Sequence, residues 1–109
     1  MGRMSRNKGA QGEREVIALL KDAGWKDAHR NFGSGSQGGS DIARGPQGVA
    51  LECKRTETLR LREAWRQATA DADERGDLPV VMHRWNGGEW LAILPADELL
   101  ALLRMREAA

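Results

Sequence analysis

Three side chains of the kinds that handle metal ions and phosphates lie close together in the middle of this sequence. Asp41 ends a segment rich in glycine and serine, and Glu52 and Lys54 follow beyond a short Gly-Pro-Gln-Gly stretch. Carboxylate oxygens are hard ligands that suit Mg²⁺. A lysine beside them can position an attacking water or stabilise the charge that builds on phosphorus. The three residues therefore suit metal-dependent hydrolysis of a phosphodiester.

Strand periodicity predicts that these side chains meet. Residues 45–48 suit a β-turn, because proline occupies its second position and glycine its fourth. The turn makes Asp41–Arg44 and Val49–Arg55 antiparallel neighbours. Side chains alternate along a strand, so Glu52 and Lys54 point the same way, beside the aspartate. Taken alone, a glutamate and a lysine at this spacing are more often a solvated surface pair.

The order of motifs along the chain resembles the D…(D/E)-x-K signature of the restriction-endonuclease-like nucleases, the PD-(D/E)XK superfamily. Within it, the chain is most similar to the archaeal-type Holliday junction resolvases and their phage relatives. The matching pieces are, in chain order, Lys8-Gly9 to Glu13-Arg14, Arg30 to Ser36, Ser40-Asp41-Ile42, Leu51 to Lys54, Gln67, and the hairpin Met82 to Leu94. They extend over nearly the whole chain, which makes the ordered set more specific than the short signature.

The resemblance implies a fold, a cofactor and a set of site residues. The fold is α/β, a single-domain restriction-endonuclease-like fold with a mixed five-stranded sheet flanked by helices, in the order αβββαββα. The cofactor is Mg²⁺, for which Mn²⁺ substitutes, held by Glu13, Asp41, Glu52 and the backbone carbonyl of Cys53. Catalytic roles fall on Glu13, Asp41, Glu52, Lys54, Ser34 and Gln67. The partners are branched double-stranded DNA and a second copy of the chain, with no membrane and no small-molecule substrate.

Several of these residues also have simpler interpretations. Glu13 lies on the apolar stripe of a predicted helix, where an acid needs a cation, but a glutamate in a first turn is also favoured by the helix dipole. The glycine and serine loop at residues 33–40 can approach a phosphate, but such loops are as often flexible linkers. Gln67 is in the middle of a helix, where a glutamine is usually a solvated residue.

Composition limits the other classes of function. The chain has 109 residues, enough for one small domain, and a formal charge of +1, so net charge alone does not indicate nucleic acid. Local cationic clusters do indicate phosphate binding. The candidate DNA contacts are Arg3, Arg6, Lys8, Arg14, Arg30, Ser34, Ser36, Arg55, Arg60 and Arg62. The terminal cluster is as readily an ordinary solvated surface.

The single cysteine and the lack of long apolar runs indicate in which compartment of the cell the protein works. Cys53 cannot form an internal disulfide, and it faces away from Glu52, so we expect a small core residue. No apolar run is long enough to cross a membrane or to form a signal peptide near the start. Neither histidine has a zinc-like spacing to the cysteine. We therefore expect a cytoplasmic protein of a bacterial, archaeal or phage-infected host cell.

The expected elements form one nuclease domain over residues 1–109. A mobile basic arm at residues 1–9 precedes helices and strands at about Ala10–Ala23, Trp25–Phe32, Asp41–Arg44, Val49–Arg55, Arg62–Arg75, Leu78–Trp85 and Glu89–Leu94, with a last helix from Pro95. That last helix has a wide leucine face, part of which suits contact with another subunit.

Taken together, these features predict a metal-dependent DNA endonuclease that resolves four-way junctions by paired nicks. The first alternative is another nuclease of the same superfamily, such as a phage nicking or end-processing enzyme. The second is a DNA-binding module that has lost its activity, against which the retention of all three signature residues argues.

Overall fold

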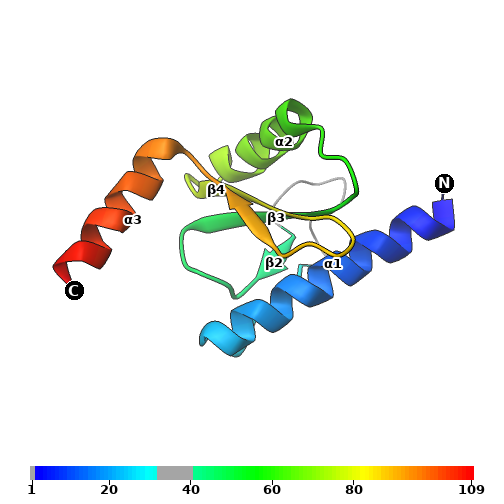
Figure 1. The fold of residues 1–109 in the computed structure, drawn as a ribbon, viewed down its shortest axis with the longest axis horizontal. Coiled ribbons are helices and arrows are strands. Elements are labelled where there is room, and N and C mark those ends of the chain that lie inside the picture. The colour runs from blue at the N-terminus through cyan, green and yellow to red at the C-terminus, as the bar shows by residue number, and fades with distance from the viewer. Residues whose placement is uncertain (1, 32–40) are drawn as a thin grey trace.

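A computed structural model of the chain describes residues 2–31 and 41–109, and for residues 2–8 it describes the backbone alone. The elements are α1 (Gly2–Ala23), β1 (His29–Arg30), β2 (Ile42–Ala43), β3 (Val49–Arg55), α2 (Leu61–Asp73), β4 (Leu78–Arg84), β5 (Leu91–Ile93) and α3 (Ala96–Ala108). This order confirms the predicted αβββαββα arrangement of a single mixed α/β unit (Figure 1).

The strands in the described part of the chain are divided between two sheets. In the larger sheet β3 runs parallel to β4, with Lys54 opposite His83, and β4 runs antiparallel to β5. The strands β1 and β2 form a short antiparallel pair. A hydrogen bond of 3.0 Å from the Asp41 amide to the Leu51 carbonyl connects this pair to β3. The predicted neighbours, Asp41–Arg44 and Val49–Arg55, thus lie side by side. Isolated hydrogen bonds connect them rather than a regular ladder.

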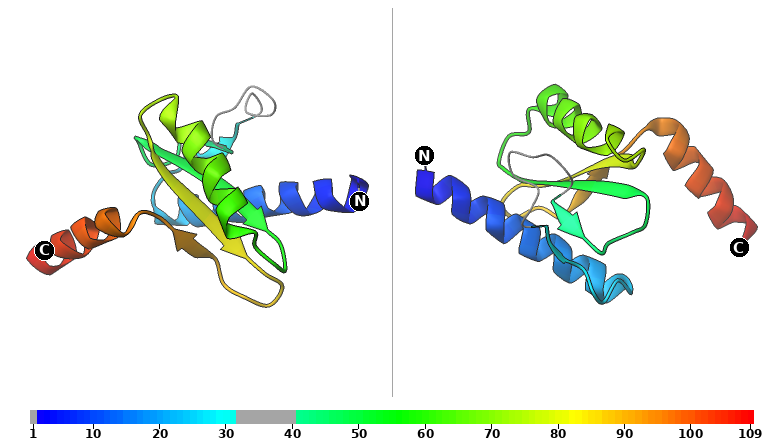
Figure 2. Two further views of the ribbon diagram at one scale, coloured as in Figure 1. Left: turned by 90° about the horizontal axis from the view of Figure 1, so that it is seen from above. Right: turned by 180° about the vertical axis from the view of Figure 1, so that it is seen from behind.

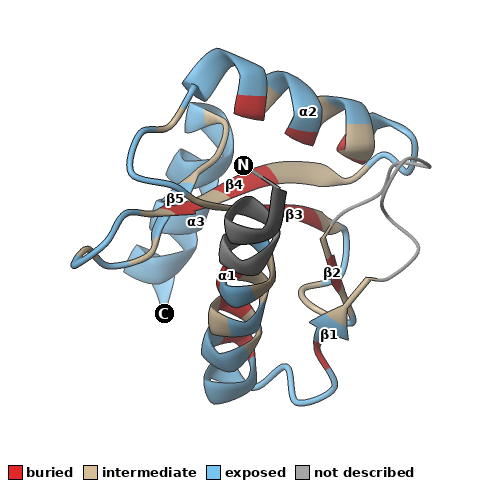
Figure 3. Ribbon diagram, turned by 90° about the vertical axis from the view of Figure 1, so that its right-hand side faces the viewer, coloured by how far each residue is buried: buried red, intermediate tan, exposed pale blue. Residues whose placement is uncertain are grey.

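The larger sheet is packed between two helices. Figures 2 and 3 show α1 and α2 on its opposite faces, with buried residues facing inward. Val16 and Leu20 of α1 pack with Leu51 of β3 in one apolar cluster. On the other face, a row of buried alanines in α2, at positions 64, 68 and 72, allows the helix to lie close to the sheet. The spacing of four residues places the three alanines on one side of the helix.

Three predicted boundaries are corrected by the structure. Helix α1 begins at Gly2 rather than Ala10, so residues 2–9 continue the helix instead of forming a separate arm. The first strand covers His29–Arg30, much less than predicted, although position 32 lies outside the described residues. The turn before β3 is closed by the Val49 amide and the Pro46 carbonyl at 3.3 Å, one residue later than predicted, with Gly48 at a φ of 76°.

Helix α3 extends away from the rest of the molecule (Figure 1). None of its residues is buried, and its large apolar side chains are exposed, namely Leu99, Leu100, Leu102, Leu103 and Met105. Within the described chain, neither α3 nor any other helix combines the length and the apolar character needed to cross a bilayer.

Candidate active site

Asp41 is fixed against β3 by hydrogen bonds at both its backbone and its side chain. Its amide donates to the Leu51 carbonyl, and its Oδ2 accepts from the Cys53 amide at 2.8 Å. Burial raises the pKa of this carboxyl, the Cys53 hydrogen bond opposes that shift, and the negative charge of Glu13 adds to it. The predicted approach of Asp41 to β3 is thus present, and it places a carboxylate at the edge of the larger sheet.

Glu52 is the largest of the fully buried side chains, with 1% of its surface exposed. Its Oε1 has no hydrogen-bond partner among the described residues. Burial raises the pKa of Glu52 to about 9, helped by a carboxyl hydrogen bond with Asp71 and by the negative charge of Asp41. A buried glutamate with an oxygen that lacks a partner lowers the stability of the fold. Folding alone therefore does not explain why a glutamate occupies position 52.

Lys54 points to the same face of β3 as Glu52, as predicted. Its Nζ donates a hydrogen bond of 2.8 Å to Oε1 of Gln67 on α2. A cavity of about 280 Å³ begins at this pair and is also lined by the hydroxyl-bearing Thr56 and Thr58. Gln67, which the resemblance assigned to the site, is therefore brought to the lysine by the packing of α2 on β3.

Glu13 faces the same region from α1 but is paired with an arginine. Arg30 Nε lies 3.0 Å from Glu13 Oε2, and its Nη2 lies 3.4 Å from Oε1. The negative charge of Glu13 nevertheless helps to raise the pKa of Asp41. The expectation that Glu13 turns toward the sheet is supported, with a guanidinium as its present partner.

A complete three-acid metal centre is not assembled in this structure. Among residues 2–31 and 41–109, no three acidic, histidine or cysteine side chains are arranged to hold a metal ion. Asp41 and Glu52 interact through their charges, but Glu13 is turned to Arg30. The convergence of all three acids on one ion therefore stays a prediction, with Glu13 paired to Arg30 in this structure.

Comparison with known proteins identifies the group to which this arrangement belongs. Residues 4–108 match the family described as "Phage putative PDDEXK endonuclease". The chain belongs to this phage PDDEXK endonuclease family. No curated protein gives a significant match. The family supports an endonuclease.

A solved structure confirms the fold of this PDDEXK family member. The structure is that of Hjc from Archaeoglobus fulgidus, a Holliday junction resolvase from an archaeal hyperthermophile. It has a TM-score of 0.59 and 24% sequence identity, covering 80% of this chain and 72% of that one. The predicted restriction-endonuclease-like fold is thereby confirmed.

The remaining predicted residues of this PDDEXK family member are placed in different surroundings. Cys53 packs against the α1 side of the sheet as a partly buried core residue, and burial raises the pKa of its thiol. Arg14, Arg60 and Arg62 are exposed, so their guanidinium groups can reach a phosphate. Ser34 and Ser36 lie outside the described residues, as do the side chains of Arg3, Arg6 and Lys8.

Arg55, another predicted DNA contact, belongs to an internal ion network. Its Nε lies 3.1 Å from Oε2 of Glu15, and its Nη1 donates to Asn86 Oδ1 at 2.9 Å. The opposite oxygen of Glu15 accepts from Arg84 and, at 3.0 Å, from the Trp90 indole. With 11% of its side chain exposed, Arg55 connects α1 to the sheet rather than presenting a free charge to solvent.

Sequence reasoning missed two acids of this PDDEXK family member. Asp71 follows Gln67 by four residues on α2, a spacing that places both on one side of the helix, and this was the available signal. Glu15 carries no comparable signal, because its partners come from β3, β4 and the segment before β5. Only the docking of α1 on the sheet brings them together.

Proposed function

We propose that this protein is a metal-dependent DNA endonuclease that cuts phosphodiester bonds at branched DNA and resolves four-way junctions by paired nicks. The observation that carries the proposal is the buried Glu52 carboxylate, whose Oε1 lacks a partner among the described residues. It shares one face of β3 with the amine of Lys54 and interacts with the charge of Asp41. A buried acidic oxygen of this kind is stabilised by a bound cation.

Asp41 and Glu52 suit a divalent ion by their chemistry. Both offer carboxylate oxygens, and Mg²⁺ is usually bound by one or two carboxylates together with waters and phosphate oxygens. Mg²⁺ is the proposed cofactor, with Mn²⁺ as substitute, and the Cys53 backbone carbonyl is a proposed further ligand. A bound ion of this class supplies a more acidic water and neutralises phosphate charge. Glu13 would be the third acid of this site if Arg30 released its carboxylate to bind a DNA phosphate.

The chain's own residues would then orient the reacting groups. Gln67 accepts a hydrogen bond from Lys54 and so holds the amine at the mouth of the cavity. There Lys54 positions the attacking water or stabilises the charge that develops on the phosphate, an effect of a few kcal/mol for such groups. Ser34 stays a proposed catalytic residue on the resemblance alone. Arg14, Arg30 and Ser36 are the proposed contacts to phosphates beside the cut.

A cleavage assay with active-site variants tests the activity. Asp41→Asn, Glu52→Gln and Lys54→Ala should each nearly abolish Mg²⁺-dependent cleavage of a labelled four-way junction while leaving junction binding largely intact. Asp73→Asn is the matched control, because Asp73 is an exposed acid at the end of α2. Wild-type turnover by all three site variants would reject the assignment.

The choice of substrate is tested separately. A four-way junction has two-fold symmetry and needs two paired cuts, which a symmetric dimer supplies. Cleavage rates on immobile four-way junctions, flaps, single strands and linear duplex distinguish a resolvase from another nuclease of the family. Faster cleavage of flaps or single strands would favour the phage nicking or end-processing alternative. Tight junction binding without cleavage of any of these substrates in Mg²⁺ or Mn²⁺ would favour an inactive binding module.

Helix α3 supports the proposed homodimer. It is apolar over much of its circumference, and a helix of that kind is normally covered. Asp97 and Glu98 lie in its first turn and Arg106 in its last, so two copies in antiparallel orientation bring opposite charges together. Sedimentation of the wild type and of Leu100→Glu tests this pairing: a dimer that the substitution converts to a monomer supports it. A wild-type monomer at micromolar concentration contradicts it.

A further inference from the structure

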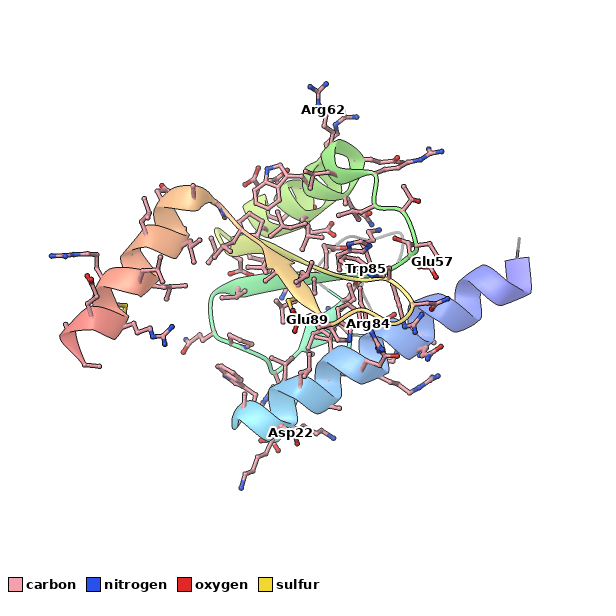
Figure 4. All side chains as sticks on the ribbon, in the orientation of Figure 1. Asp22, Glu57, Arg62, Arg84, Trp85 and Glu89 are labelled. Atoms are coloured by element: carbon pink, nitrogen blue, oxygen red, sulfur yellow. The ribbon has the colours of Figure 1, made fainter. Side chains whose placement is uncertain are left out.

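An exposed tryptophan stands at the open end of the face that carries Glu52 and Lys54. Trp85 directly follows β4 and has 42% of its surface exposed. In the parallel register Lys54 is opposite His83, and the ring of His83 contacts that of Trp85 at a centroid distance of 5.8 Å. Trp85 therefore lies on the same side of the sheet as Lys54, two residues or about 7 Å further along. Figure 4 shows Arg84 on the opposite side.

The indole ring of Trp85 is held in position by neighbouring residues and does not lie free on the surface. A Cβ atom at Gly88 would lie 2.8 Å from Cε2 and Nε1 of Trp85, so only glycine lets the ring lie there. Below the ring, His83 is buried, and its Nε2 lies 2.9 Å from the carbonyl oxygen of Thr56. Since Thr56 also lines the cavity beside Lys54, one segment of chain contributes both to the support of the indole ring and to the candidate active site.

The turn that carries Trp85 is held by polar contacts to the end of β3 and the residues just after it, and by one contact across the turn itself. The Asn86 amide donates to Glu57 Oε2 at 3.0 Å, and the Asn86 side chain accepts from Arg55 at 2.9 Å. Arg84 Nε donates to the Gly88 carbonyl at 2.7 Å. A large aromatic surface that is exposed and yet fixed in this way binds with little loss of side-chain freedom.

The charges beside Trp85 decide what such a surface can bind. Glu57 and Glu89 are exposed acids on either side of the turn, and both repel the phosphate backbone of a nucleic acid. The cations Arg55 and Arg84 are already paired with Glu15. An aromatic ring flanked by acids suits an uncharged planar group, and the neutral planar part of DNA is the base.

We infer that Trp85 stacks on a nucleobase that is unpaired or terminal at the branch point of the DNA, and so selects branched over continuous duplex. The inference rests on the proposed function and deepens it. Stacking on an aromatic side chain is available only where the base is not already covered by its neighbours, which is the case at a branch and not along a continuous duplex. Paired bases inside a duplex cannot reach the indole.

Binding measurements in the absence of cleavage test this inference. Fluorescence anisotropy in Ca²⁺ compares a four-way junction with a linear duplex of the same length, using wild type, Trp85→Ala, Trp85→Phe and Gly88→Ala. We expect Trp85→Ala to lose about tenfold in junction affinity and to bind duplex as wild type does. Trp85→Phe should retain most of the affinity. Gly88→Ala should lose part of it, because the added methyl displaces the ring while the tryptophan is kept.

Trp25 provides the matched control. It is 40% exposed, close to the value for Trp85. It lies beyond the C-terminal end of α1, and that end is about 16 Å along the helix from Gly12, the position next to Arg55. Trp25→Ala should bind junction and duplex as wild type does. A 2-aminopurine base at the branch supplies a second readout, since its fluorescence should be quenched by wild type and by Trp85→Phe but not by Trp85→Ala.

The outcomes separate this inference from the proposed function. If wild type cleaves junctions and Trp85→Ala keeps wild-type junction affinity, the stacking role is overturned and the nuclease assignment stands. Equal losses on junction and duplex would also overturn it, because they indicate general damage, which thermal unfolding of each variant reveals. If wild type cleaves no DNA, the proposed function fails, while a junction-specific loss in Trp85→Ala still supports stacking.

Discussion

Two glutamates lie on opposite faces of the larger sheet, and their pKa values are shifted in opposite directions. Glu15 on the α1 side accepts hydrogen bonds from Arg84 and Trp90 and pairs with Arg55. Burial raises its pKa, but these partners outweigh burial, so the pKa of Glu15 lies below its ordinary value. Glu52 on the α2 side is buried next to acids, and burial together with these neighbours raises its pKa to about 9. Glu15 thus finds its cations and hydrogen-bond donors within the protein, whereas Oε1 of Glu52 has no partner among the described residues.

The difference separates a structural acid from a candidate functional one. A charge that is compensated by its own protein contributes to folding. A buried carboxyl without a cation costs stability, and such uncompensated groups cluster at functional sites. The comparison therefore predicts that neutralising Glu52 harms activity and spares stability, whereas neutralising Glu15 does the reverse.

The largest effect is expected from Glu52→Gln. Cleavage should fall about 1,000-fold, because the amide cannot serve as an anionic metal ligand. The unfolding free energy of the metal-free protein should stay the same or increase above pH 7, since a neutral group replaces a buried acid. Single-turnover cleavage and urea unfolding measure the two quantities on one preparation. A variant that keeps its cleavage rate, or loses rate only in proportion to lost stability, would contradict the functional assignment of Glu52.

The second effect is the reverse case, Glu15→Gln. The change leaves Arg55 and Arg84 close together without an anion, so the unfolding free energy should fall by about 2 kcal/mol. The folded fraction should cleave at nearly the wild-type rate. Urea unfolding measures the loss, and Glu89→Gln, an exposed acid, serves as control. An unfolding free energy equal to that of the control would show that the network does not stabilise the fold.

Local patterns were sufficient to predict the elements that carry the site. Strand β3 has the predicted bounds, because a turn signal precedes a run whose alternate residues are apolar. The buried face of α2 carries alanines four residues apart, a pattern that is visible in the sequence. The predicted start of α1 was wrong because Gly2 and Gly9, which are poor helix formers, indicated an arm. Gly12 is explained by the fold, since a Cβ there would lie 3.0 Å from Cβ of Arg55.

The partners of the site residues were harder to predict than the residues themselves. Alternation along β3 placed Glu52 and Lys54 on one face, and the turn brought Asp41 beside them. Asp71 reaches Glu52 only because α2 docks in one rotation on the sheet, which no local pattern specifies. The pairing of Glu13 with Arg30 likewise depends on where α1 lies relative to β1. Long-range docking was therefore the missing information.

A third prediction concerns pH. The folded pKa of Glu52 is about 9 and its ordinary value is 4.5, so between these values the folded state binds the proton more strongly than the unfolded state does. Stability from this group is full below about pH 4.5 and is lost as the pH rises toward 9. The metal-free wild type should lose up to about 1 kcal/mol per pH unit over that window.

Urea unfolding at pH 6, 7, 8 and 9 with a chelator measures this slope. Glu52→Gln should flatten it, leaving the smaller contribution of Asp41, whose raised pKa acts in the same direction. Glu15→Gln should keep it, because Glu15 has a lowered pKa and titrates in the acid range. A wild-type stability that is constant or rises from pH 6 to pH 9 would show that Glu52 is not protonated in the folded metal-free protein.

The smallest effect extends the comparison from acids to arginines. Arg62 is exposed on α2 and points away from the body of the protein (Figure 4), and it makes none of the ion pairs found in the described part of the chain. Arg62→Ala should leave the unfolding free energy unchanged and weaken junction binding about threefold. It should also reduce the slope of log Kd against log salt by about 1, as expected for one phosphate contact. Arg55→Ala should instead lower stability, because its charge is already used by Glu15. Anisotropy titrations at several salt concentrations measure the slope, and an unchanged slope for Arg62→Ala would place the DNA backbone on another surface.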